Sequence, residues 1–249
     1  MENKLVVKIY DSREEMGLEA AEIAAAKINE LLSQKDEVNM IFAAAPSQNE
    51  FLATLIQKDI DWGRVNAFHM DEYVGLAADA PQGFGNFLKE KIFGKVPFKS
   101  VIYLNGNASP IEEECKRYEG LLQEKPTDIV CMGIGENGHI AFNDPHVADF
   151  NDPALVKVVD LDEACRQQQV NDGCFATFDD VPTHALTLTV PALMKAKHVF
   201  CMVPGELKAT AVYNTLHQPQ THQHPSTILR SHPDAILFLD ANSSSKLDK

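Results

Sequence analysis

Positive charge and long apolar runs are both scarce in this sequence. Its 249 residues include 22 Lys and Arg against 36 Asp and Glu, which gives a formal net charge of -14. Such a chain repels a phosphate backbone on average, so we expect no nucleic-acid partner. No segment approaches the roughly 18 consecutive apolar residues that a membrane span needs, so we expect no membrane partner and a cytoplasmic location.

Cysteines are also few, and their spacing is irregular. The five of them form no paired pattern of the kind that builds a disulfide framework or a zinc site. Cys131 and Cys201 lie within apolar segments, and we interpret all five as buried thiols. Four histidines near the C-terminus stand at irregular spacing among Gln, Thr and Pro residues, which favours an exposed loop over a metal site: His217, His222, His224 and His232. We therefore predict no bound metal.

The sequence indicates one domain without a linker. No stretch is rich enough in Pro, Gly or Ser to separate two domains, and the sequence has no internal repeat. We predict one domain over residues 1–241, followed by a polar C-terminal tail at 242–249. Apolar segments suited to strands alternate with amphipathic helical segments, and 12–15 has the spacing of a capping box. This alternation predicts an α/β fold with a doubly wound, mainly parallel, Rossmann-like sheet and helices on both faces.

A glycine-rich loop follows the apolar segment 129–132. Its glycines allow positive φ angles and a close backbone approach to a ligand, and the loop then presents His139. The spacing Gly-x-Gly-x-x-Gly also occurs in dinucleotide-binding loops, which lead into a helix. Here Asn143-Asp144-Pro145 interrupts the chain soon after Gly138, which argues against a dinucleotide. A histidine in a glycine loop at the carboxyl end of a buried strand is instead typical of an active site.

A carboxylate, Asp71, follows another short strand segment at 65–69. In doubly wound sheets ligands bind at the carboxyl ends of the strands, where this residue is expected to lie. Two adjacent acids such as Asp71 and Glu72 are most often part of a solvated turn or a helix cap. Neighbouring apolar side chains would nevertheless shield Asp71 from water, and a carboxylate that is partly removed from water gains basicity: Met70, Tyr73 and Val74.

Three further positions are candidates for binding an anion. Residues 44–50, which include Ser47 and Gln48, form a turn into a helix, and backbone N–H groups there can receive a phosphate; an ordinary N-cap by Ser47 fits equally well. Lys208 stands at a helix start, where the helix dipole disfavours a cation unless an anion compensates it. Arg166 stands among glutamines and is either a surface arginine, a phosphate ligand or a lid residue.

Two motifs of this chain resemble those of the glucosamine-6-phosphate deaminase/isomerase family. They are Phe68-His69-Met70-Asp71-Glu72-Tyr73-Val74-Gly75-Leu76 and, from Gly133 to Asn143, Gly-x-Gly-x-Asn-Gly-His-Ile-Ala-Phe-Asn. A similar order of strands and helices continues through Lys208 to about residue 240. The resemblance implies a phosphorylated amino-sugar substrate, glucosamine 6-phosphate or galactosamine 6-phosphate. It also implies that the products are a ketose 6-phosphate and ammonia and that no cofactor is needed.

The resemblance further implies roles for individual residues. His139 would assist opening of the sugar ring, Asn137 and Asp144 would orient or assist the imidazole, and Asp71 would move a proton between C1 and C2. The residues expected to bind the substrate, with Lys208 at its phosphate, are Ser47, Gln48, Gly138, Arg166 and Lys208. Family members often form hexamers or other oligomers, so a homo-oligomer stays open for this chain.

The chain departs from the family pattern at four places. Asn137 stands where many members have Asp, and Asp144 stands where they have Glu. The loop at 43–47 contains alanines where the family's phosphate loop is richer in Gly and Thr. The family's phosphate arginine near 171–174 is absent, which makes Arg166 the substitute candidate.

These departures keep two alternatives open. One is 6-phosphogluconolactonase, which shares the fold and a Gly-His loop, although that family typically continues with Thr-Ala-Ser-Leu-Phe-Pro rather than Ile140-Ala141-Phe142-Asn143. The other is a sensor that binds a sugar phosphate without turning it over. Ammonia release from an amino-sugar phosphate separates the deaminase from both.

Overall fold

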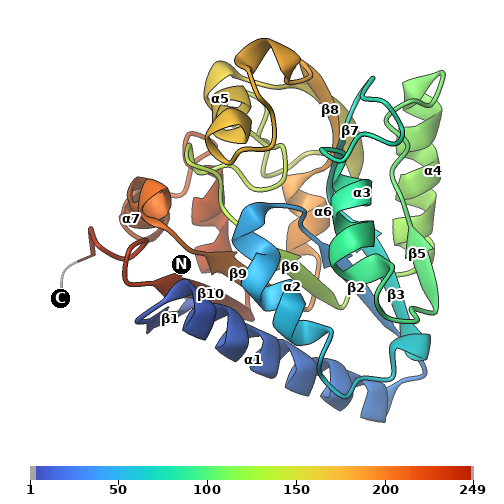
Figure 1. Ribbon diagram of the computed structural model, residues 1–249, viewed down its shortest axis with the longest axis vertical. Coiled ribbons are helices and arrows are strands. Elements are labelled where there is room, and N and C mark those ends of the chain that lie inside the picture. The colour runs from blue at the N-terminus through green and yellow to red at the C-terminus, as the bar shows by residue number, and fades with distance from the viewer. Residues whose placement is uncertain (1–3, 248–249) are drawn as a thin grey trace.

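The computed structural model describes residues 4–247 and contains a parallel sheet of seven strands (Figure 1). All neighbouring strands in this sheet run parallel. In spatial order they are β1 (Val6–Tyr10), β10 (Ala235–Asp240), β9 (His198–Val203), β6 (Ile129–Met132), β2 (Val38–Phe42), β3 (Val65–His69) and β5 (Ser100–Ile102). The prediction of a mainly parallel sheet is confirmed.

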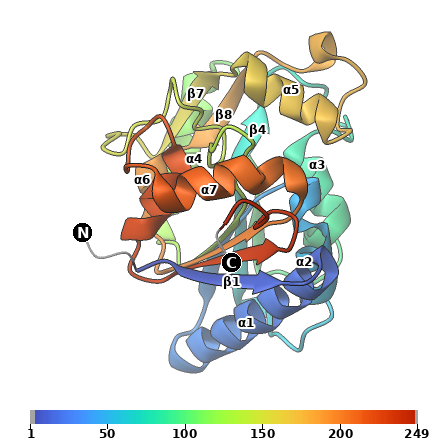
Figure 2. The ribbon, with the colours of Figure 1, turned by 90° about the vertical axis from the view of Figure 1, so that its left-hand side faces the viewer.

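Helices cover both faces of this sheet (Figures 1 and 2). One face carries α1 (Arg13–Gln34), α2 (Asn49–Leu55) and α3 (Phe84–Leu88), and the other carries α4 (Ile111–Glu124), α6 (Val190–Met194) and α7 (Ala209–His217). Alternate residues of one strand serve the two layers: Met40 and Phe42 pack in the core with α1, whereas Ile41 packs in the core with α4. Burial on both faces explains why the strands read as continuous apolar runs.

The strand order reverses between β2 and β6. From β2 the chain adds β3 and β5 toward one edge, and β6 then returns to the other side of β2, from which β9 and β10 lead toward β1. Ligands of open α/β sheets bind at the carboxyl ends of the strands where the order reverses. The chain after β2 stays paired with β6 there, since Ala43 N–H donates to the carbonyl of Cys131 at 2.9 Å. The loops that follow β2 and β6 therefore start side by side.

The packing of α1 on α2 sets the position of the loop after β2. The predicted start of α1 is confirmed, because Ser12 Oγ accepts a hydrogen bond from the N–H of Glu15 at 3.1 Å. Farther along α1, Gly17 faces α2, and an added Cβ would lie 2.5 Å from Cβ of Glu50. The absence of a side chain at Gly17 thus lets the two helices approach closely at the start of α2.

A small antiparallel sheet lies beside the carboxyl edge of the parallel one (Figure 1). Its strands, in order, are β4 (Asp71–Tyr73), β8 (His184–Leu188) and β7 (Val156–Asp160), and α5 (Glu163–Asn171) follows β7. The sequence placed Asp71 on a loop, whereas the structure pairs it with Thr187 of β8. Strand pairing fixes the backbone of Asp71, and a strand this short has no alternating pattern that a sequence would reveal.

The last described residues fold back against the sheet. Asp240 Oδ1 accepts a hydrogen bond from the N–H of Ser243 at 2.7 Å, and Ser243 is fully buried. Leu247 packs against the core that contains α7. The described part of the predicted polar tail, 242–247, is therefore ordered by these contacts rather than frayed. Between residues 4 and 247 no helix is long and apolar enough to cross a membrane.

Two side-chain expectations need correction. Cys131, Cys165 and Cys201 are buried as predicted, but Cys115 and Cys174 are only half-buried. His232 was expected on an exposed loop, yet it is buried, with Nε2 2.8 Å from the carbonyl of Ala196. The polar residues around His232 in the sequence give no sign of this tertiary hydrogen bond.

Candidate active site

A pocket lies at the carboxyl ends of β2, β3, β6 and β9. Its wall includes Ser47, Asp71, His139 and Lys208, which come from four separate segments of the chain. The sequence singled out each of these residues on local grounds. The structure brings all four to the same pocket because their strands end at the same edge of the sheet.

The His139 imidazole is held by two side chains behind it. Its Nδ1 lies 2.8 Å from Oδ1 of Asn137 and 3.0 Å from Oδ1 of Asp144. The Asn137 amide donates to the same Asp144 oxygen at 2.9 Å. Two oxygen acceptors at Nδ1 favour the tautomer with the proton on that nitrogen, which leaves Nε2 as the basic nitrogen. Gly135 makes room for the ring, since a Cβ at that position would clash with it.

Asp144 is fully buried and reaches the imidazole despite its short side chain. Burial raises the pKa of Asp144, but the neighbouring His139 and the amide of Asn137 outweigh this effect and hold the pKa below its ordinary value. Oδ1 makes these contacts, whereas Oδ2 has no hydrogen-bond partner among the described residues. The buried carboxylate therefore carries negative charge beside the imidazole with half of its acceptor capacity unused.

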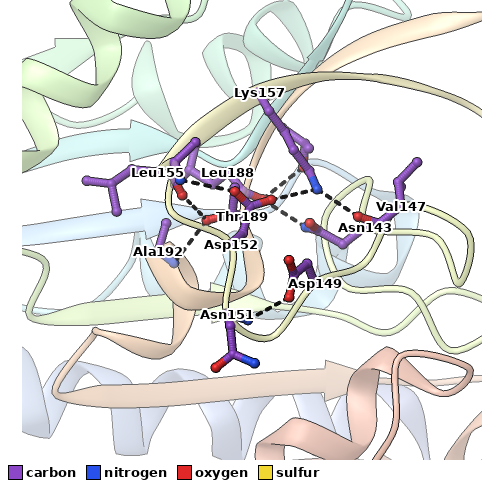
Figure 3. Close-up of polar contacts among 12 residues, drawn as sticks. Asn143, Val147, Asp149, Asn151, Asp152, Leu155, Lys157, Leu188, Thr189 and Ala192 are labelled. Atoms are coloured by element: carbon purple, nitrogen blue, oxygen red, sulfur yellow. Dashed lines mark hydrogen bonds and ion pairs between the residues drawn. The ribbon is translucent and has the colours of Figure 1, made fainter.

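The segment that carries Asp144 is fixed by polar contacts to the antiparallel sheet (Figure 3). Asn143 donates through its amide to the carbonyl of Leu188 at 2.8 Å. Lys157 on β7 donates to the carbonyl of Val147 at 2.7 Å. These bonds attach the chain on both sides of Asp144 to β7 and β8. The carboxylate is thus presented by a held backbone rather than by a free loop.

Asp71 faces the pocket from β4 and is only 7 % exposed. Burial, followed by the charge of Glu72, raises the pKa of Asp71 well above its ordinary value of 3.8. Met70 lines the pocket as the sequence suggested, and Phe84 and Phe142 add apolar walls that it did not suggest. Glu72 does not compete for the pocket, because its carboxylate accepts hydrogen bonds from the backbone N–H groups of Tyr73, Phe84 and Gly85. Asp71 therefore has the environment of a strong general base.

A second histidine, His69, holds the backbone at Asp71. Its Nδ1 lies 2.9 Å from the carbonyl of Asp71, and its Nε2 accepts a hydrogen bond from the N–H of Leu104 at 2.9 Å. Burial lowers the pKa of His69 to about 4, so the ring is neutral at neutral pH. A neutral ring with Nε2 as acceptor carries its proton on Nδ1, and that proton bonds the Asp71 carbonyl.

The two pocket residues that the sequence predicted to bind an anion are Lys208 and Ser47. Burial lowers the pKa of Lys208, and the charges of Asp172 and Glu136 oppose this effect. Ser47 lies in a short 3-10 turn, Pro46–Gln48, and its hydroxyl caps neither that turn nor α2. The N-cap alternative for Ser47 is therefore excluded. The hydroxyl instead accepts a hydrogen bond from the Gln48 amide at 3.1 Å and remains on the pocket wall.

Three residues predicted to bind the substrate lie outside the pocket wall. The Arg166 guanidinium donates to the carbonyls of Phe178 and Val181, at 2.9 Å each, and stacks on the Phe178 ring at 4.0 Å. These contacts direct the guanidinium to the segment 178–181, and Arg166 is not part of the pocket wall. Gln48 is buried and braces the loop after β2. Gly138 has a φ of +87° and forms the turn behind His139.

Four polar residues on the pocket wall were not predicted. Arg13, at the start of α1, donates to the carbonyl of Pro46 at 3.0 Å and to Glu50 at 2.9 Å. The other three lie on or just after α5: Gln168, Gln169 and Asp172. Arg13 was not predicted because the capping-box pattern of residues 12–15 accounts for that segment as an ordinary helix start. The run of glutamines on a helix next to the active-site loop was a usable signal for the others.

Two groups of side chains in the described residues have the composition of a metal site. The first is His139, Asp144 and Cys165, and the second is Asp144, His146 and Asp162. Both include Asp144, but only the first is completely buried and contains sulfur. The acid–base chemistry considered for His139 and Asp144 does not require a metal at either group.

Comparison with known proteins agrees with this geometry. Residues 11–237 match the family described as glucosamine-6-phosphate isomerases/6-phosphogluconolactonase. A glucosamine-6-phosphate deaminase of Bacillus cereus is 37% identical over 98% of this chain and 88% of its own length, and one of Bacillus thuringiensis matches equally well. A solved monomeric glucosamine-6-phosphate deaminase superposes with a TM-score of 0.87 at 29% identity, over 96% of this chain and 99% of its own.

Solved lactonases share the fold. The 6-phosphogluconolactonase of Thermotoga maritima superposes with a TM-score of 0.78 at 21% identity, covering 95% of this chain and 100% of its own. An identity this low extends the likeness to the architecture alone.

Proposed function

The chain belongs to the glucosamine-6-phosphate isomerase/6-phosphogluconolactonase family, and we propose that it is an enzyme that converts glucosamine 6-phosphate into fructose 6-phosphate and ammonia. The observation that carries this proposal is one pocket with Asp71, His139 and Lys208 on its wall. Two acid–base groups and a cation suit proton transfer beside a carbonyl of a phosphorylated sugar. The deaminases that match nearly the whole chain support the same reaction.

His139 opens the sugar ring in this proposal. Its Nε2 takes the proton of the C1 hydroxyl and returns it to the ring oxygen as the bond between C1 and that oxygen breaks. Asn137 and Asp144 hold Nδ1, so the imidazole keeps its orientation and tautomer while Nε2 works. The negative charge of Asp144 stabilises the imidazolium that forms between the two transfers.

Asp71 moves the proton from C2 to C1 in the open-chain sugar. The carboxylate takes the C2 proton while the C1 carbonyl oxygen gains one from solvent water, which leaves an enol with the amino group on C2. Asp71 then gives the proton to C1, and the nitrogen lone pair forms a C2 imine. Its burial in a pocket that Met70, Phe84 and Phe142 also line supports this role, because a desolvated carboxylate is the stronger base.

Hydrolysis of the imine completes the reaction. Water adds to C2, ammonia leaves, and the ketone of fructose 6-phosphate remains. The nitrogen takes up the C=N electron pair when water adds, and a lone pair of the added oxygen then forms the ketone and expels ammonia, so the mechanism uses no cofactor.

We assign the phosphate to the end of the pocket that holds Ser47, Lys208 and Arg13. Lys208 is buried, so its ammonium faces a low dielectric in which an anion is strongly attracted. Arg13 uses Nη2 for Pro46 and Glu50, and its buried Nε has no hydrogen-bond partner among the described residues. In this proposal Arg13 provides the guanidinium that the family pattern places near 171–174.

We also propose a cytoplasmic location, where phosphorylated sugars are retained by their charge. For assembly, a solved monomeric deaminase superposes on 96% of this chain. Activity should therefore not require a partner subunit. Sedimentation of active enzyme at assay concentration tests this.

A substrate panel tests the proposed function. Purified chain is incubated with glucosamine 6-phosphate, galactosamine 6-phosphate and 6-phosphogluconolactone, and ammonia, ketose 6-phosphate and lactone loss are measured. We expect ammonia and fructose 6-phosphate in equal amounts from the first compound. If only galactosamine 6-phosphate gave ammonia, together with tagatose 6-phosphate, the substrate would be the galacto epimer instead. Lactone hydrolysis without ammonia would identify a lactonase, and binding without any product would identify a sensor.

A further inference from the structure

Cys165 stands directly behind the proposed ring-opening residues and has no part in the mechanism. It lies in the first turn of α5, is 1% exposed, and its N–H donates to Oδ1 of Asp162 at 2.6 Å. One ligand atom each from Cys165, His139 and Asp144 lie within 4.8 Å of one another. A thiol, an imidazole and a carboxylate therefore converge on one buried point.

An unused acceptor marks the same point. Asp144 is 0% exposed, yet its Oδ2 has no hydrogen-bond partner among the described residues. A buried carboxylate oxygen without a partner is costly, and native structures usually satisfy such atoms with a hydrogen bond, a water or an ion. This oxygen is an observation separate from the grouping of the three side chains.

We propose that His139, Asp144 and Cys165 form a binding site for a soft divalent cation of the zinc type, and that its occupation inhibits the enzyme. Nitrogen, oxygen and thiolate sulfur are the three donor types that zinc accepts, at about 2.0–2.3 Å. The three ligand atoms now lie within 4.8 Å of one another, and binding would bring them to such distances from one cation. When the cation binds, the thiol proton passes to the solvent and the Nδ1 proton of His139 is displaced, so the neutral ring carries its proton on Nε2. A water or a sugar hydroxyl completes the coordination.

Inhibition follows from the role of His139, so this part of the inference rests on the proposed function. A cation on Nδ1 takes the lone pair that must carry the proton now shared with Asn137 and Asp144. The imidazole then cannot become a normal imidazolium during ring opening. Occupation also withdraws the charge of Asp144 from the ring.

The alternative group of Asp144, His146 and Asp162 is the weaker candidate. It lacks sulfur, which selects soft cations. His146 is exposed and its Nε2 already lies 3.0 Å from Oδ2 of Asp160. It provides a matched control, because it shares Asp144 with the proposed site but not the thiol.

The test is a titration of the substrate-free chain with Co²⁺ and Cd²⁺, followed by thiolate-to-metal charge-transfer absorption. We expect a band that saturates at one ion per chain in the wild type and is lost in Cys165→Ser and Cys165→Ala. His146→Gln and Cys174→Ser should retain it. Two substitutions at Cys165, each checked by circular dichroism, separate loss of the ligand from loss of the fold.

An inhibition assay with Zn²⁺ completes the test. Each variant is compared with its own rate in the presence of a chelator, and we expect Cys165→Ser to need at least about 10-fold more zinc for half-inhibition. The proposal is overturned by absence of the band in the wild type, by a band that survives both Cys165 substitutions, or by a band that His146→Gln removes. The absorption needs no turnover, so an enzyme inactive toward amino-sugar phosphates would fail the functional proposal and still report on this one.

Discussion

The pocket has two halves that differ in how completely the folded chain prepares them. In the proposed proton-transfer half, Asp71, His139 and Asp144 are buried, and Asn137, His139 and Asp144 are in polar contact with one another. The phosphate half, made of 43–47, Lys208 and Arg13, has alanines in its loop and a lysine whose burial is uncompensated by a bonded partner among the described residues. In the proton-transfer half, the polar contacts of the imidazole are made by other side chains of the protein. In the phosphate half, the charge of Lys208 is free to bind a charged group of the ligand.

This difference has a chemical reason. Proton transfer depends on donor and acceptor positions within a fraction of an ångström, so the groups that orient a base must be built in. An anion, by contrast, can be bound by various combinations of cations, hydroxyls and N–H groups. Each half departs from the family pattern at two places. In the first, Asn137 and Asp144 still hold the imidazole, whereas the second has alanines at 43–47 and no arginine near 171–174.

The largest effect is expected from the base of the proton-transfer half. Asp71→Asn should lower kcat by about 10³-fold or more, because the amide cannot take the C2 proton. Binding of fructose 6-phosphate, which depends on the phosphate half, should change little. The measurements are steady-state kinetics and calorimetric binding. Exchange of the C1 proton of fructose 6-phosphate with solvent deuterium at the wild-type rate would remove Asp71 from the mechanism.

The next largest effect distinguishes ring opening from the later C2-to-C1 proton transfer, both of which occur in the proton-transfer half. His139→Gln should slow the closed-ring substrate by about 10²-fold while an open-chain analogue loses less than about 10-fold, because only the closed sugar needs ring opening. Both substrates are compared by kcat/KM in one buffer. Equal losses on the two substrates would contradict a ring-opening role.

In the phosphate half, Lys208→Met should raise KM by about 10–100-fold with a smaller change in kcat, because the lost charge mainly weakens binding. Glucosamine without phosphate is the control, and its poor turnover should be indifferent to the substitution. A fall in kcat with unchanged KM would move Lys208 to the other half of the pocket.

A smaller effect tests the residue that the sequence did not reveal. Arg13→Met should raise KM by about 3–10-fold, since Arg13 shares its guanidinium with Pro46 and Glu50. Arg166→Met is the matched control: it removes an arginine that stacks on Phe178 away from the pocket and should leave KM unchanged. The reverse ranking of the two variants would restore Arg166 as the phosphate ligand.

The smallest effect concerns stability and pH. The folded chain raises the pKa of Asp71 above 3.8, so it holds the proton more tightly than the unfolded chain does. Stability therefore falls as pH rises from 3.8 through the folded pKa, and Asp71→Asn escapes this loss. The variant should melt a few degrees above the wild type at pH 8, with a smaller gap at pH 3.5, in calorimetry. A gap that does not depend on pH would argue that Asp71 has an ordinary pKa.

The same property shapes the activity profile of the wild type. Asp71 must be ionised to act as a base, so kcat/KM should decline on the acid side with a midpoint well above 3.8. A chain fully active down to pH 4 would contradict the raised pKa.

The parts of the molecule that sequence could predict are those with a local signal. Asp71 comes just after β3 and His139 lies in the glycine loop after β6. Because parallel strands end at one edge, their convergence could be foreseen. The antiparallel sheet could not, because β4 is three residues long and pairs with a strand far along the chain. Arg13 could not be predicted either, because its position at the start of a capped helix gives no sign of a ligand. The stacking of Arg166 on Phe178 could not be foreseen, because composition cannot distinguish a guanidinium stacked on a ring from one facing a ligand.

The most direct test of the central claim is turnover of glucosamine 6-phosphate labelled with deuterium at C2 by the wild-type chain. If Asp71 and His139 act on one sugar phosphate as proposed, deuterium leaves C2 in step with ammonia release. It then appears at C1 of fructose 6-phosphate or in the solvent. Ammonia release with the deuterium still on C2, or no ammonia at all, would contradict the account.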